Sequence, residues 1–147
     1  MAKRLILFIH GLGGAGEATW RRRGRPGFPE LIRNDPALRS ACDIAFFEFP
    51  TSLFRLPFNT KTPRVRDLAE GLRSQIDVCY PNYDSIALVC HSLGGLIARK
   101  YLVEEVKRGA DLRVAKLLLF AVPNHGAALA SVARHVSWHN GQLTHCT

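Results

Sequence analysis

The sequence has 147 residues, of which 47% are hydrophobic and 22% charged, and its formal net charge is +8. This composition predicts one globular domain, residues 1–147, with a core of ordinary size. The apolar run from Leu5 to Ile9 is too short for a signal peptide, and no stretch reaches the roughly 20 apolar residues of a membrane span. We therefore expect a cytoplasmic protein.

Four cysteines show no spacing typical of zinc ligands: Cys42, Cys79, Cys90 and Cys146. We expect free thiols, no metal and no other cofactor. Four arginines gather in one Gly/Pro-rich loop: Arg21, Arg22, Arg23 and Arg25. The simple interpretation is a solvated basic loop, and the alternative is peripheral contact with an anionic membrane surface. No aromatic residues alternate with these arginines, so nucleic-acid binding is not expected.

Four apolar segments predict β-strands: Leu5 to Ile9, Ile44 to Phe49, Ile86 to Cys90, and Leu117 to Val122. The first crossover is irregular and predicts only short helices, at Phe28 to Arg33 and Pro36 to Ala41. In the second, Thr62 is a candidate N-cap, and apolar residues at helical spacing run from Val65 to Cys79. In the third, a helix is expected from residue 93 to residue 108, with Gly109 as its C-terminal stop.

Strands that alternate with helical crossovers predict an α/β fold, a parallel sheet of about four strands with helices on both faces. In such sheets, ligands bind at the carboxyl ends of the strands. The residues of chemical interest all follow a strand: His10 to Gly14, Glu48 to Thr51, His91 to Leu93, and Pro123 to Gly126. The sequence therefore predicts a functional site at this one edge of the sheet.

Ser92 stands between the third predicted strand and the helix that follows it. A serine exposed on such a turn is a candidate nucleophile, and the alternative is an ordinary helix N-cap. The N–H of Leu93, at the positive end of the helix, would point to where negative charge develops beside Ser92. Gly94 and Gly95 would let the helix pack closely against the neighbouring strand.

A second oxyanion donor must come from another loop, and His10-Gly11-Leu12-Gly13-Gly14 follows the first strand. We expect the N–H of Leu12 to be that donor, because glycines on either side allow a tight turn. His10 is interpreted as a brace for this turn, with a direct catalytic role as the alternative. His91 is expected to pack or hydrogen-bond beside Ser92.

Both stretches resemble motifs of the α/β-hydrolase superfamily: its G-x-S-x-G nucleophile elbow and its H-G-x-G oxyanion loop. The likeness is greatest to lipase-like serine esterases, and Ala121 to Ala127 resembles their T-P-x-x-G-S segment. The resemblance implies that the first strand lies between the second and the third. Cys90 replaces the first glycine of the elbow, a departure from the pattern at a crowded crossing of strand and helix.

The family places an Asp or Glu and then a His after the serine, but no Asp or Glu follows Asp111. His125 is a candidate substitute base. We therefore expect 1–147 to be the N-terminal part of an incomplete α/β-hydrolase fold, with an exposed sheet edge beyond Leu117 to Val122. It should be a serine hydrolase of small-molecule or lipid esters, inactive or weakly active as this truncated chain.

Two other functions stay open. The first is a non-catalytic hydrolase remnant that binds a lipid or a protein partner. The second is dinucleotide binding, because Gly11 to Gly16 matches G-x-G-x-x-G after a strand. The regular helix and the acidic residue that a dinucleotide site requires do not follow at the usual spacing, so this match alone is weak.

Overall fold

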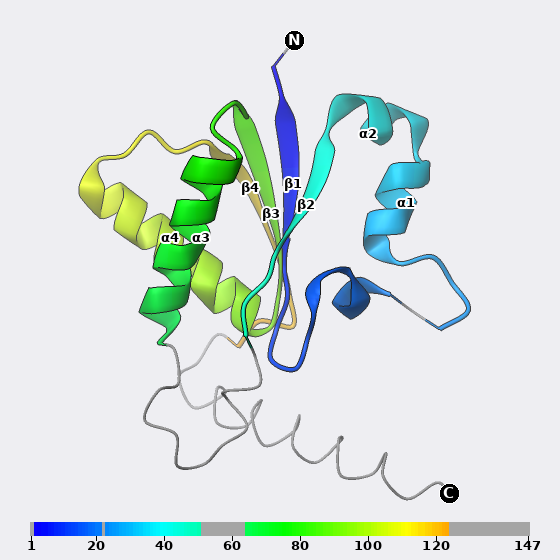
Figure 1. Cartoon of the computed structure of the whole chain (residues 1–147), viewed down its shortest axis with the longest axis horizontal. Helices are drawn as coiled ribbons and strands as arrows, with labels where there is room; N and C mark the ends of the chain where they lie inside the picture. Colours follow the sequence, from blue (N-terminus) through cyan, green and yellow to red (C-terminus); the bar gives the residue numbers. More distant parts are fainter. Residues whose placement is uncertain (1, 22, 51–63, 124–147) are drawn as a thin grey trace, which may run out of the picture.

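The computed structural model describes residues 2–21, 23–50 and 64–123. Its centre is a parallel sheet of four strands, β1 (Arg4–Ile9), β2 (Asp43–Phe47), β3 (Ser85–His91) and β4 (Val114–Phe120), in the order β2-β1-β3-β4 (Figure 1). The first strand lies between the second and the third, as the family resemblance implies. Each carboxyl end therefore lies at the same edge of the sheet, where the predicted motifs begin.

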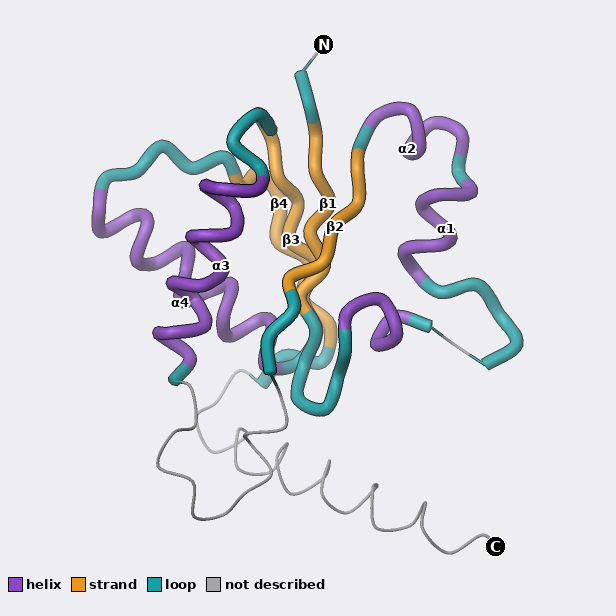
Figure 2. Tube along the Cα trace, viewed as in Figure 1, coloured by secondary structure: helices purple, strands orange, loops and turns teal. Residues whose placement is uncertain are grey.

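Helices cover the two faces of this sheet unequally (Figure 2). One layer holds α3 (Val65–Cys79) and α4 (Leu93–Arg108), which pack against each other. The other holds the 3-10 helix η1 (Gly16–Trp20) and the short helices α1 (Phe28–Asn34) and α2 (Pro36–Ala41). This second layer covers its face incompletely: Phe28 of α1 reaches Phe120 of β4, whereas a hollow separates α2 from the amino-terminal parts of β3 and β4.

Alternation along the strands divides the core into two parts, as the pleat of a sheet requires. Leu5, Leu7 and Ile9 of β1 pack against the α3 and α4 layer, while Phe8 points the other way, where Ile32 and Val89 join it. Leu7, Phe8 and Ile9 are completely buried. The central strands are thus buried on both faces, which explains their unbroken apolar runs.

Helix α4 has the predicted bounds, and Gly109 ends it in the left-handed conformation with φ of 66°. The two short helices also lie where expected. Helix α3 begins later than predicted: Arg64 is its N-cap, and the carboxylate of Asp67 accepts a hydrogen bond from the Arg64 N–H at 3.2 Å. The prediction of Thr62 as N-cap was therefore wrong, because the capping acid lies three residues after Arg64.

The outer strands differ from the prediction at their ends. β2 stops at Phe47 rather than Phe49, since the N–H of Phe49 turns to the His10 ring instead of the ladder. β4 begins at Val114 and ends at Phe120, with an irregularity in its pairing between Ile86 and Ala87 of β3. β4 is the edge strand of the described sheet, and Phe120 is 43% exposed, in line with the predicted open edge.

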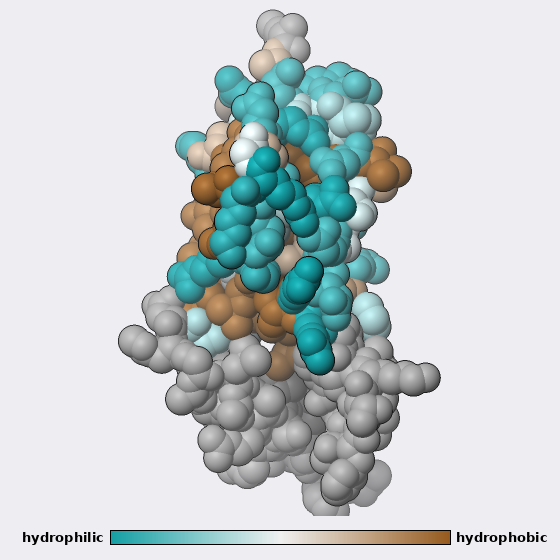
Figure 3. All heavy atoms as spheres, turned by 90° about the vertical axis from the view of Figure 1, so that its left-hand side faces the viewer, coloured by the Kyte–Doolittle hydropathy of each residue, from teal (hydrophilic) through white to brown (hydrophobic). Residues whose placement is uncertain are grey.

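The outer surface of the α3 and α4 layer is mainly hydrophilic, with hydrophobic atoms at its margins (Figure 3). Ion pairs link side chains on this surface, among them Glu70 with Arg108 between the two helices and Lys100 with Glu104 within α4. Within the described ranges, no helix is long and apolar enough to cross a membrane.

Candidate active site at the carboxyl edge of the sheet

Ser92 occupies a strained turn between β3 and α4. Its φ of 50° and ψ of −117° lie outside the regions that non-glycine residues ordinarily adopt. Such a conformation costs about 1–3 kcal/mol and persists only where the surrounding structure holds it. Here the Ser92 N–H donates to the carbonyl of Phe120 at 2.9 Å, which ties the turn to the end of β4.

Ser92 does not act as a conventional helix cap. Its side chain accepts no capping hydrogen bond, and the N–H of Gly95 bonds instead to the Ser92 carbonyl oxygen at 3.1 Å. The hydroxyl bonds to none of the described residues, although only 7% of Ser92 is exposed. A hydroxyl left unused on a strained turn is the arrangement expected of a nucleophile rather than of an N-cap.

Two glycines allow α4 to begin this close to the sheet, as predicted. A Cβ atom on Gly94 would meet the carbonyl oxygen of Ile9 and would lie 2.7 Å from that of His10. A Cβ atom on Gly95 would meet the side chain of Val122 and would lie 3.1 Å from Leu119. The first turn of α4 therefore fits between the ends of β1 and β4 only because both side chains are absent.

The loop after β1 lies directly against the serine. A Cβ atom on Gly11 would lie 2.8 Å from Cβ of Ser92 and 3.0 Å from Nδ1 of His91. The loop then turns through a hydrogen bond from the Gly14 N–H to the Gly11 carbonyl at 3.2 Å. The structure thus brings the two predicted motifs into contact, although they are about 80 residues apart in the sequence.

The two predicted oxyanion donors are neighbours of this contact in the sequence, since Leu12 follows Gly11 and Leu93 follows Ser92, and their role stays a prediction. The N–H of Leu93 belongs to the first turn of α4, where helical N–H groups have no acceptor within the helix. The Leu12 N–H, like that of Leu93, donates to no group in the described part of the chain. The Leu12 side chain is half-buried and packs against the main core, and this contact anchors the loop to the core.

His10 holds the loop through both nitrogens of its ring. Nδ1 lies 2.9 Å from the Gly11 carbonyl oxygen, and Nε2 accepts from the Phe49 N–H at 3.4 Å. The ring is 1% exposed and stacks on that of Phe49, with centroids 4.2 Å apart. Because Nε2 must accept, Nδ1 carries the proton, and the neutral ring has no free lone pair for a proton from Ser92. This geometry supports the bracing role.

His91 points away from the α3 and α4 layer, to the face of β3 that carries η1 and α1. There its ring packs edge-on against that of Trp20, with centroids 6.3 Å apart. Burial lowers the pKa of its imidazole. Its Nδ1 and the Nε1 of Trp20 are buried and find no partner among the described residues. Both side chains line an open hollow of about 400 Å³, together with Phe28 and Phe120. The hollow offers apolar surface next to the serine turn.

Cys90 is completely buried in the main core, and burial raises the pKa of its thiol to about 12. A neutral thiol of this size fits where the family pattern has glycine, so the departure is accommodated. Cys42, Cys79 and Cys90 are all free thiols, as expected, while Cys146 lies outside the described residues. The described part also holds no group of side chains that could bind a metal ion.

The third motif begins where β4 ends. Ala121 has φ of 49°, a second strained turn, and Val122 packs on Gly95. His125, the predicted substitute base, lies outside the described residues. So does Arg22 of the basic loop, whereas Arg21, Arg23 and Arg25 are exposed. The role of this loop at a membrane stays a prediction.

The sequence predicts no role at this site for two residues that the structure places there. Phe49 holds His10 from the end of β2, and Trp20 ends the 3-10 helix η1 that follows the glycine loop. Phe49 lies in the predicted edge segment Glu48 to Thr51, but its contact with His10 was not predicted. The sequence around η1 has no apolar periodicity or capping residue that would predict a helix. Gly16, its first residue, has a φ of 38° and lies beside Glu48.

The glycine loop is unsuited to a dinucleotide. Gly11 faces the serine turn, Gly14 faces Thr19 and His10, and Gly16 faces Glu48. The loop leads into a short 3-10 helix, and a dinucleotide site requires a long helix with a free N-terminus at this position. The dinucleotide reading is therefore not supported.

Comparison with known proteins agrees with the hydrolase reading. The family model described as alpha/beta hydrolase family matches residues 6–144. The chain is similar to Protein SERAC1 of Bos taurus, with 27% identity over 90% of this chain, and of Mus musculus, with 28% identity over 90%. It spans 23% of the length of these relatives. No solved structure is significantly similar. On the family match, the chain belongs to the alpha/beta hydrolase family.

Proposed function

We propose that this chain carries the nucleophile and oxyanion hole of a serine hydrolase that cleaves carboxylic esters with an apolar part. Ser92 is the nucleophile, and the N–H groups of Leu12 and Leu93 stabilise the oxyanion. The observation that carries the proposal is the contact between the glycine loop and the serine turn, where a Cβ on Gly11 would lie 2.8 Å from Ser92.

The chemistry follows from that contact. The Ser92 oxygen attacks the ester carbonyl, a base removes its proton, and the carbonyl oxygen becomes an oxyanion between two N–H donors. Collapse of this intermediate expels the alcohol and leaves an acyl-serine, which water then hydrolyses. The apolar hollow beside His91, lined by Phe28 and Phe120, supports an ester with an apolar acyl or alcohol group.

His125 is the candidate base, because it follows the carboxyl end of β4 by a few residues in the sequence. Its role is separate from that of the oxyanion hole, so the two need different tests. Loss of p-nitrophenyl butyrate hydrolysis in both Ser92→Ala and His125→Ala would support the pair. Full activity in His125→Ala would remove His125 from the mechanism without affecting the oxyanion hole.

The oxyanion hole can be tested without any base through Ser92→Cys. A thiol at a helix N-terminus has a lowered pKa and attacks activated esters unaided. Acylation by p-nitrophenyl acetate, located by peptide mass spectrometry, should be at least tenfold faster at position 92 than at exposed Cys79, which serves as an internal control. Equal rates would contradict a preorganised oxyanion hole and favour a non-catalytic domain.

A further inference from the structure

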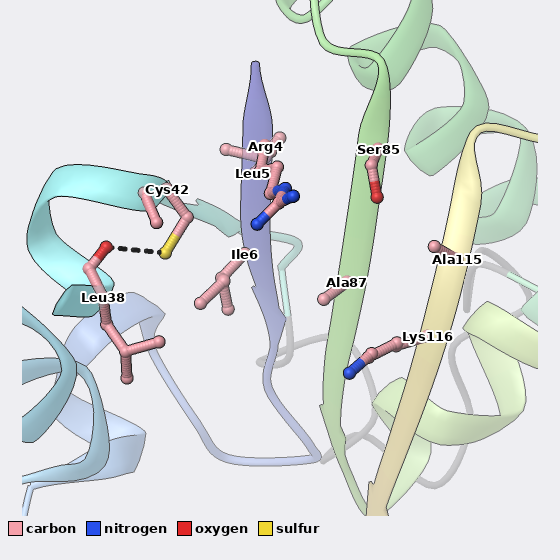
Figure 4. A pocket seen from close by; sticks show the side chains of 10 residues that line it. Arg4, Leu5, Ile6, Leu38, Cys42, Ser85, Ala87, Ala115 and Lys116 are labelled. Carbon is pink, nitrogen blue, oxygen red and sulfur yellow. Dashed lines mark hydrogen bonds between the residues drawn. The ribbon is translucent and has the colours of Figure 1, made fainter. Parts of the chain in front are cut away.

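A second hollow lies at the other end of the sheet, on the face that α1 and α2 cover only in part. It measures about 450 Å³ and lies between α2 and the amino-terminal halves of β1, β3 and β4 (Figure 4). Ser85 and Ser92 are separated by the length of β3, about 20 Å at the usual rise of a strand. The hollow is therefore distinct from the candidate active site.

Its floor and walls are apolar and mostly small. Ile6 and Ala87 form the floor, Leu38 and Ala41 of α2 form one side, and Ala115 the other. Ala87 pairs with Ile6 on one side and with Lys116 on the other, so its short side chain leaves room in the middle of the sheet face. The size falls in the range of small-molecule sites.

Two cations and a hydroxyl face this space. Arg4, Lys116 and Ser85 all direct their polar ends into it (Figure 4). Arg4 pairs with Ser85, and Lys116 pairs with Ala87 two residues further along β3. Strand spacing then puts the Cα atoms of Arg4 and Lys116 about 12 Å apart, within reach of two long side chains that hold one anion.

The irregularity in β4 determines which way Lys116 points. Val114 pairs with Ile86, but Lys116 rather than Ala115 pairs with Ala87, so Ala115 is an extra residue. In regular pairing without this bulge, Ala115 would pair with Ala87 and Lys116 with Leu88, which belongs to the core beneath α3 and α4. The bulge thus places the ammonium group on the open face, as bulges do when they redirect a side chain.

Neither cation is neutralised within the described residues. Neither Arg4 nor Lys116 forms an ion pair there. Two nearby acids accept hydrogen bonds from other groups: Asp43 from the Tyr83 hydroxyl at 2.7 Å, and Asp84 from the Lys3 N–H at 2.7 Å.

The thiol of Cys42 also lines the hollow. Burial, with a smaller contribution from Asp43, raises its pKa, so it adds no negative charge at neutral pH. The hollow is positive and apolar at once.

We propose that this hollow binds an amphiphilic carboxylate of the fatty-acid type, with its head between Arg4 and Lys116 and its chain over Ile6 and Ala87. The Ser85 hydroxyl can donate a further hydrogen bond to the head. The inference does not rest on the role of Ser92, because the two sites share no residue.

Ligand-observed NMR titration with octanoate as a monomer tests the proposal. Octanoate should bind at least tenfold more tightly than acetate, which lacks the chain, and than octan-1-ol, which lacks the charge. Arg4→Gln and Lys116→Gln should each weaken octanoate binding about five- to tenfold, while Arg66→Gln, an exposed cation on α3, should leave it unchanged. Added salt should weaken binding to the native chain more than to these two variants.

A second variant tests shape rather than charge. Ala87→Ile fills the centre of the hollow with a residue favoured in strands, so octanoate binding should be lost while the thermal unfolding midpoint is kept. Equal binding of acetate or octan-1-ol would overturn the proposal, as would unchanged binding in Arg4→Gln and Lys116→Gln. Binding to anionic phospholipid vesicles without binding of octanoate would overturn it too, in favour of a membrane surface.

Discussion

The stabilities of the Gly94→Ala and Gly71→Ala variants, compared with each other, test whether close packing of α4 on the end of β1 holds the serine turn. Both glycines lie within helices, so alanine improves helix propensity at both, by up to about 1 kcal/mol. Their surroundings differ. A Cβ on Gly71 would meet only the ring of Phe47 at 3.7 Å, whereas a Cβ on Gly94 would lie 2.7 Å from the carbonyl oxygen of His10 and 2.9 Å from the carbonyl carbon of Ile9.

The magnitude follows from these distances. The backbone of Ile9 and His10 cannot rotate away, so α4 must move by about 0.7 Å to restore an ordinary contact with the carbonyl oxygen of His10, and by more to clear that of Ile9. Overpacking of this kind costs about 1–3 kcal/mol. After the gain in helix propensity, Gly94→Ala should lower the free energy of unfolding by about 1–2 kcal/mol and Gly71→Ala should raise it by about 0.5–1 kcal/mol. For a chain of this length the midpoint should fall by about 3–8 °C in Gly94→Ala and rise by about 2–4 °C in Gly71→Ala.

Thermal and urea unfolding followed by circular dichroism at 222 nm measure both changes. The shift of α4 also moves the Leu93 N–H, so Gly94→Ala in the Ser92→Cys background should slow acylation at position 92, and Gly71→Ala should not. Equal stability of the two variants, or unchanged acylation in Gly94→Ala, would refute the argument that the approach of α4 to β1 sets the turn.

Further predictions concern single groups of the site. In the Ser92→Cys background, Leu12→Ala keeps the backbone N–H and should retain acylation, whereas Leu12→Pro removes that donor and should lower the rate about 100-fold; similar rates in both would contradict the role of this N–H. Burial lowers the pKa of His91 below 6.5, so the unfolded state binds more protons as the pH falls through that value, and stability should decrease as the pH falls below about 6.5. His91→Asn should show a shallower slope in urea titrations over this range, and an identical slope would contradict the shift. The thiol pKa of about 12 predicts that iodoacetamide at pH 8 modifies exposed Cys79 and spares Cys90 until the chain is unfolded, as peptide mass spectrometry can show.

The sequence predicted the elements whose local signals agree with their tertiary environment. Helix α4 has a glycine stop, a basic last turn and a full apolar face, and its bounds were predicted correctly. The strand order followed from the family resemblance, and it is confirmed. The contact of Gly11 with Ser92 could be expected in outline, because the carboxyl ends of adjacent parallel strands meet at one edge.

The predicted strand ends are wrong where a contact with a residue distant in the sequence sets the end of the strand. Phe49 reads as part of a strand, but its N–H bonds to the ring of His10, 39 positions earlier, so β2 ends at Phe47. The start of β4 was missed because Ala115 and Lys116 interrupt the apolar run, and only pairing with β3 makes them part of a strand. No single-sequence pattern contains either long-range contact.

The two proposed sites should act independently, and the reason lies in β3. The strand carries Ser85 and Ala87 toward the anion hollow and ends at the serine turn, while Leu88 and Cys90 between them are locked in the core beneath α3 and α4. Effects of substitutions more than about 10 Å apart without shared partners usually add. Arg4→Gln should thus leave the acylation rate of Ser92→Cys unchanged, and octanoate should not slow it. If octanoate slowed acylation in Ser92→Cys but not in Ser92→Cys with Arg4→Gln, binding in the hollow would affect the serine turn through β3.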